Sequence, residues 1–103
     1  LLNETESEDN GPLVLVVEDN PDVARYLQTC LEPTYRTVFA GNGNTGIEMA
    51  LDTVPDLIVS DIMMPGADGY ELCRTLKTDL KTSHIPIVLL TARADNPSKL
   101  AGL

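Results

Sequence analysis

Residues 56–70 read DLIVSDIMMPGADGY. Leu57 to Ser60 form a short run of apolar or small residues, typical of a strand that is covered on both faces. The run ends on a carboxylate, Asp61, and a Met-Met-Pro-Gly turn follows directly behind it. Because a buried charge is costly unless another group pairs with it, this stretch predicts a buried strand whose last side chain faces a partner.

Apolar runs and amphipathic helical patterns alternate along the chain. The runs predict strands over residues 13–17, 35–40, 56–60 and 87–90. The segments between them carry apolar helical stripes, with Cys30 in the first and Leu80 in the third, and a turn is expected at residues 41–44. Helix N-caps are expected at Asn20, Asp68 and Asn96. The order βαβαβαβα predicts an α/β fold, a doubly wound parallel sheet with helices on both faces.

The composition bounds the function. The chain has 103 residues, the size of one domain, and a net charge of −9. Residues 1–12 are acidic and polar and predict a linker, which leaves residues 13–103 as the domain. The negative charge argues against nucleic-acid binding and suits a cation site. Cys30 and Cys73 belong to no metal-binding motif, so we expect reduced core thiols in a cytosolic domain, with a disulfide between them as the less favoured alternative.

Polar residues stand where the apolar strands end: Glu18 and Asp19 after the first, Asp61 after the third and Thr91 after the fourth. In open parallel sheets, ligands bind at the carboxyl ends of the strands, where the strand order reverses. If the first and third strands are neighbours, their ends lie about 4.8 Å apart and the three carboxylates crowd together. Either their pKa values rise or a cation lies among them. Mg²⁺ accepts such ligands, and the backbone carbonyl of Met63 could join them.

A carboxylate beside a metal ion can also act as a nucleophile that forms an aspartyl phosphate. Asp61 would be that nucleophile, and the Thr91 hydroxyl could hydrogen-bond a phosphoryl oxygen. The simpler alternatives are that Glu18 or Asp19 only caps a helix, and that Thr91 only bonds to the backbone. The occurrence of all these residues at strand ends favours a site.

Three segments, LVLVVEDNPDVARYL, DLIVSDIMMPGADGYELCR and HIPIVLLTARAD, closely resemble the receiver (response-regulator) domain of two-component signalling. The resemblance covers residues 13–103. It implies a flavodoxin-like sheet of strand order 2-1-3-4-5. It also implies a phosphorylation switch that catalyses its own phosphorylation and dephosphorylation.

The resemblance assigns a role to each strand-end residue. Asp61 would accept the phosphoryl group, Thr91 would be the switch hydroxyl, and the small Ala92 would leave room for the phosphate. Mg²⁺ or Mn²⁺ would be held by Glu18, Asp19, Asp61 and the backbone carbonyl of Met63.

One departure from the family pattern is large. Receivers continue into a fifth strand and a lysine that pairs with the phosphoryl group, whereas this sequence stops at Leu103, and Lys99 falls in the fourth helix. We therefore expect a sheet of order 2-1-3-4 in a chain truncated at its C-terminus. The fourth strand would then be an open edge that could pair with a second chain in a dimer.

The implied partners are a histidine kinase domain as phosphodonor and a downstream output or phosphotransfer domain. The acidic linker and the segment before the fourth strand are most similar to receivers carried within hybrid sensor kinases. The domain would then be cytoplasmic without membrane contact, although its parent chain could be anchored in the inner membrane. The alternative is a pseudo-receiver that binds partners without phosphorylation.

Two further function classes fit the residues poorly. An aspartate-nucleophile phosphatase would carry a second aspartate where Met63 stands. A flavin carrier would need a phosphate-binding loop after the first strand, and the acidic Glu18–Asp22 segment there would repel a phosphate.

Overall fold

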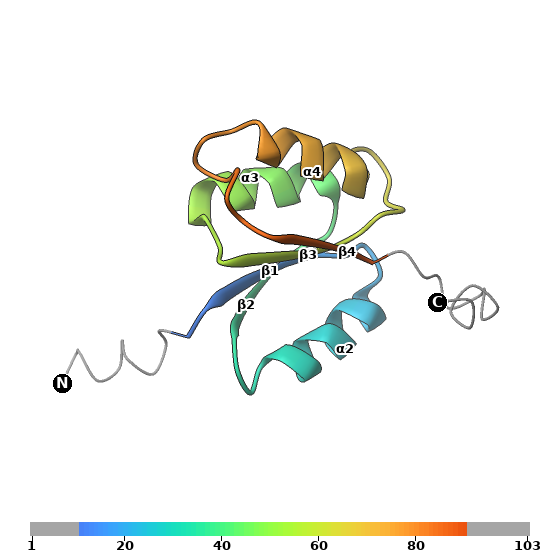
Figure 1. Cartoon of the computed structure of the whole chain (residues 1–103). Coiled ribbons are helices and arrows are strands. Elements are labelled where there is room, and N and C mark those ends of the chain that lie inside the picture. The colour runs from blue at the N-terminus through green and yellow to red at the C-terminus, as the bar shows by residue number, and fades with distance from the viewer. Residues whose placement is uncertain (1–10, 91–103) are drawn as a thin grey trace, which may run out of the picture.

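The apolar runs form strands that lie side by side in one parallel sheet (Figure 1). The structure is a computed structural model that describes residues 11–90. Its strands run in the order β2-β1-β3-β4, as predicted. The bounds of the strands are β1 Leu13–Val17, β2 Arg36–Ala40, β3 Leu57–Asp61 and β4 Ile87–Leu90.

The third strand begins one residue later than predicted, at Leu57. Asp56 is instead clamped to the start of β1. Its backbone N–H donates to the carbonyl of Leu13, and its carboxylate accepts from the N–H of Leu13, both at 2.8 Å. The strand also ends one residue later than predicted, so Asp61 is its last residue and not the first residue after it.

Helices cover both faces of the sheet (Figure 1). The helix α2 Pro21–Leu31 lies on one face, and α3 Gly43–Thr53 and α4 Gly69–Lys77 lie together on the other. The larger core cluster, on the α3 and α4 side, includes Leu15, Ile58 and Leu72. A smaller cluster on the α2 side includes Val16 and Val59. Burial on both faces explains why β1 and β3 are continuous apolar runs and do not alternate.

The predicted helix starts are observed at Asn20 and Asp68, and a further cap occurs at Asn42. The Asn42 side chain accepts a hydrogen bond from the Thr45 N–H at 2.8 Å. Because of this cap, α3 begins at Gly43, inside the segment that was expected to be a turn. The helix expected after Asn96 lies outside the described residues.

Two predicted core positions were wrong. Leu80 is 92% exposed because α4 ends at Lys77, whose ammonium group donates to the carbonyl of Ile85 at 2.6 Å and closes the turn. Cys30 is exposed because α2 packs on the sheet through Leu27 and Leu31. Both cysteines of the chain are free thiols, and Cys73 is half-buried. None of the helices within residues 11–90 combines the length and the apolar character needed to cross a membrane.

Helix α3 ends on a residue with an unfavourable backbone conformation. Val54, the C-cap, has φ 46° and ψ 68°, in the left-handed region. Its N–H still donates to the carbonyl of Ala50 at 2.9 Å, and the buried Pro55 then stops the helix. Glycine and asparagine occupy this cap position most readily, whereas the left-handed conformation costs other residues roughly 1–2 kcal/mol.

We expect Val54→Asn to raise the free energy of unfolding by about 0.5–1 kcal/mol, because asparagine tolerates the left-handed region and Val54 is partly exposed. Val54→Thr is the matched control, since it keeps the branched Cβ and should give no gain. Urea unfolding of the three chains measures both effects. An equal gain from threonine would show that polarity, and not backbone strain, is responsible.

Candidate functional site

The carboxyl ends of β1 and β3 lie side by side. The two strands pair in parallel, with Val17 opposite Ser60. The next residue after each of these, Glu18 and Asp61, therefore lies at the same level of the sheet. Glu18 keeps one more ladder contact with β2, because its N–H donates to the carbonyl of Ala40 at 3.0 Å. Asp61 pairs with Leu90 of β4. The strand order reverses between β1 and β3, which is where ligands bind in sheets of this kind.

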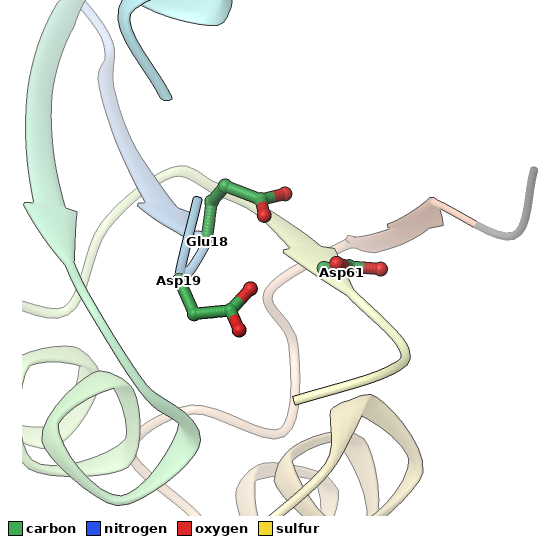
Figure 2. Close-up of side chains that lie close together, drawn as sticks. All are labelled: Glu18, Asp19 and Asp61. Atoms are coloured by element: carbon green, nitrogen blue, oxygen red, sulfur yellow. The ribbon is translucent and has the colours of Figure 1, made fainter. Parts of the chain in front are cut away.

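Three carboxylates converge at this point (Figure 2). One oxygen each from Glu18, Asp19 and Asp61 lies within 4.8 Å of the others. Glu18 is 7% exposed and Asp61 is 8% exposed, whereas Asp19 is open to solvent. The crowding expected from the strand ends is therefore present, and the pairing of β1 with β3 causes it.

The pKa of the Glu18 carboxyl is raised by burial and by this crowding. Burial is the main cause that raises the pKa of the Glu18 carboxyl, and the nearby charge of Asp61 and the hydrogen bond and charge of Asp19 raise it further. A hydrogen bond from the Asn20 N–H to Oε2 of Glu18, at 3.1 Å, opposes the shift. Burial and like charge thus make full ionisation of the three carboxyl groups unfavourable, and a bound cation would reduce this electrostatic cost.

The loop behind Asp61 holds that residue from several sides. The Met63 N–H donates to Oδ1 of Asp61 at 3.3 Å, and the Ser60 hydroxyl donates to the Asp61 carbonyl at 2.9 Å. The Gly69 N–H closes the base of the loop on the carbonyl of Ile62 at 2.9 Å. A Cβ atom on Gly69 would lie 2.7 Å from the Asp61 carbonyl oxygen, so only glycine lets α4 start this close to the acidic site.

The predicted site residues separate into two groups. Glu18, Asp19 and Asp61 come together, and Met63 lies two residues after Asp61 with a side chain that is 62% exposed. Thr91 and Ala92 lie outside the described residues.

Sequence reasoning did not find the close approach of Gly69. The dipeptide Asp68-Gly69 predicts only a helix start, and Asp68 does cap α4. The signal in the sequence was the position of Gly69, directly after the loop that follows Asp61 at the end of its strand.

The donor set fits a hard divalent cation. Carboxylate oxygens are the ligands that Mg²⁺ and Mn²⁺ prefer, and Mg²⁺ commonly binds through one or two carboxylates while it retains several waters. Asp19 is exposed, so one side of the cluster is open to water and to an incoming ligand.

The sequence of the domain as a whole points to the same kind of site. The family model described as the response regulator receiver domain matches residues 14–103. The chain belongs to this family. The flavodoxin-like arrangement expected of a receiver domain is thereby confirmed for the four strands described, together with their order.

Receiver domains of histidine kinases are among the similar proteins. Hybrid signal transduction histidine kinase D of Dictyostelium discoideum is 48% identical over 86 residues, which are 84% of this chain and 6% of that kinase. The receiver domain of a signal transduction histidine kinase from Syntrophus aciditrophicus is 39% identical, with a TM-score of 0.75 over 88% of this chain and 70% of that one.

A third relative concerns the acidic site directly. The receiver domain of a sensor histidine kinase from Pseudomonas aeruginosa PAO1 is 28% identical, with a TM-score of 0.77 over 87% of this chain and 75% of that one. Its crystal structure has a magnesium ion coordinated in the active-site cleft.

The raised pKa of Glu18 gives a pH dependence of stability. A carboxyl whose pKa is higher in the folded state destabilises the fold when it is ionised, and this cost disappears as the pH falls below both pKa values. We therefore expect Glu18→Gln to raise the free energy of unfolding of the metal-free protein at neutral pH. The gain should shrink as the pH falls through the carboxylate range.

Urea unfolding in the presence of a chelator measures this difference at each pH. Glu48→Gln, an exposed change on α3, is the control for the loss of one negative charge. A gain from Glu18→Gln that is the same at every pH would contradict the assignment to ionisation of this carboxyl.

Proposed function

We propose that this receiver domain accepts a phosphoryl group on Asp61 from a histidine kinase domain and passes the signal on through a change of conformation. The observation that carries the proposal is the convergence of Glu18, Asp19 and Asp61 at the point where the strand order reverses. In the reaction, an Asp61 carboxylate oxygen attacks phosphorus, the O–P bond forms, and the P–N bond to the donor histidine breaks. The proton that the departing imidazole needs comes from solvent or from the kinase.

Asp61 is the nucleophile that the surroundings support best. It ends a buried strand, and hydrogen bonds from Ser60 and Gly69 hold its own carbonyl and the carbonyl of the next residue, Ile62. Holding the attacking carboxylate in this way reduces the freedom that the reaction would otherwise have to remove. Glu18 and Asp19 follow β1 and flank the end of β3, so these two suit the role of supporting ligands.

Mg²⁺ or Mn²⁺ would be held by Glu18, Asp19 and Asp61, with the backbone carbonyl of Met63 as a further ligand. When bound, the ion neutralises the negative oxygens of the incoming phosphoryl group. The magnesium ion in the related Pseudomonas aeruginosa receiver domain supports this proposal.

The remaining roles follow from family membership. Thr91 would donate its hydroxyl to the phosphoryl group and so couple phosphorylation to β4, and Ala92 would keep access to Asp61 open. The kinase partner and a hybrid-kinase parent are part of the same proposal, which the histidine kinases among the relatives support. A downstream output or phosphotransfer domain and a cytoplasmic location are proposed with them.

Intact-mass spectrometry after incubation with acetyl phosphate tests the acceptor. We expect a Mg²⁺-dependent phosphoryl adduct on the unmodified chain and none on Asp61→Asn. Asp52→Asn is the matched control, because it removes an exposed carboxylate at the far end of α3 and should leave the adduct unchanged. An adduct of equal yield on Asp61→Asn would contradict the proposal. Absence of any adduct would favour a partner-binding domain that acts without phosphorylation.

The ion-binding role of Asp19 has its own test. We expect Asp19→Asn to weaken Mg²⁺ binding by about tenfold or more, because one charged ligand becomes a neutral amide. Isothermal titration calorimetry measures the affinity. Asp22→Asn removes an equally negative, exposed group nearby and is the control for the general loss of charge. Equal losses for the two variants would show that Asp19 acts through overall charge and is not a ligand.

A further inference from the structure

The loop that carries Met63 rests on the first residue of α3. Gly43, the first residue of that helix, is buried, and a Cβ atom on it would overlap the carbonyl oxygen of Ala67 and lie 2.8 Å from the Ala67 carbonyl carbon. The neighbours in this clash are backbone atoms, which cannot turn aside as a flexible side chain can. The start of helix α3 and the loop after β3 lie at the same end of the sheet (Figure 1).

A second close contact joins the same two segments. Gly66, in the loop, has a positive φ of 74°, and a Cβ atom on it would lie 3.3 Å from the side-chain nitrogen of Asn44. The tip of the loop, Gly66 and Ala67, thus packs on Gly43 and Asn44 at the start of α3. We call this contact the seat of the loop. It depends on one glycine from each segment, Gly66 and Gly43.

The rest of the loop is fixed at points that link this seat to the acidic site. Met64 is buried in the larger core cluster, and Asp68 caps α4. At the other end, the Met63 N–H bonds to the carboxylate of Asp61. Both ends of the loop are held, so a displacement of Ala67 cannot be confined to the tip of the loop. The displacement therefore extends to the backbone around Met63.

We infer that Gly43 is a positioning residue for the proposed site: by letting the loop after Asp61 lie directly on the start of α3, it sets the backbone of Met63 beside the carboxylates. The residue touches neither ion nor phosphoryl group and acts through the loop. The inference rests on the proposed function and adds to it a residue from a helix that contributes none of the three carboxylates.

The experiment uses the whole chain with methyl-¹³C methionine. The sequence holds three methionines, of which Met63 and Met64 lie in the loop and Met49 lies in α3 as an internal reference. Methyl NMR spectra are recorded without metal and during a Mg²⁺ titration. One experiment therefore reports both the loop position and the ion affinity.

We expect Gly43→Ala to shift the loop methyl signals before any ion is added and to weaken Mg²⁺ binding about tenfold, the loss typical when the support of a metal ligand is removed. Gly41→Ala is the matched control, because a Cβ atom there meets no atom within 4 Å. Ile85→Val controls for general destabilisation, since it trims the core next to the start of β4.

Gly66→Asn places a Cβ atom against Asn44 from the loop side at an exposed position, and asparagine tolerates the positive φ of this residue better than alanine does. It should act in the same direction, so it decides the matter if Gly43→Ala does not fold. A wild-type spectrum and affinity in both seat variants would overturn the inference alone. Equal losses of affinity in Ile85→Val would overturn it as well. A wild-type chain that shows no response to Mg²⁺ would overturn the proposed function and this inference together.

Discussion

The parallel pairing of β1 with β3 is the contact on which the site depends. It places Val17 opposite Ser60 and so brings the next residues, Glu18 and Asp61, to one level at the sheet's carboxyl edge. A shift of one residue in this register would turn every side chain of a strand to the other face. The buried valines and isoleucine of the two strands prevent that shift, because each face of the sheet is packed against helices.

Placing three carboxylates together works against folding of the metal-free chain. The raised pKa of Glu18 shows that burial and like charge both oppose its ionisation. The core on either side of the sheet offsets this cost, and a bound cation would lower it. A domain built in this way responds to a local change of charge, which is the property that a phosphorylation switch needs.

Much of this arrangement could be predicted from the sequence. Continuous apolar runs gave the strands, and asparagine or aspartate before each helical pattern gave two of the helix starts. The strand-end carboxylates were identified because charged residues are out of place after buried strands. Contacts between distant segments could not be predicted. The Asp56 clamp on Leu13, the exposure of Leu80 and the seat on Gly43 depend on how segments meet after folding.

The central claim is that Asp61 carries the phosphoryl group in an acyl phosphate. Borohydride reduces such a mixed anhydride to an alcohol, so treatment of the phosphorylated chain followed by peptide mass spectrometry identifies the modified residue. The account predicts homoserine at position 61 when Mg²⁺ is present and none when it is chelated. Homoserine at another aspartate, or a reduced glutamate at position 18, would contradict the account.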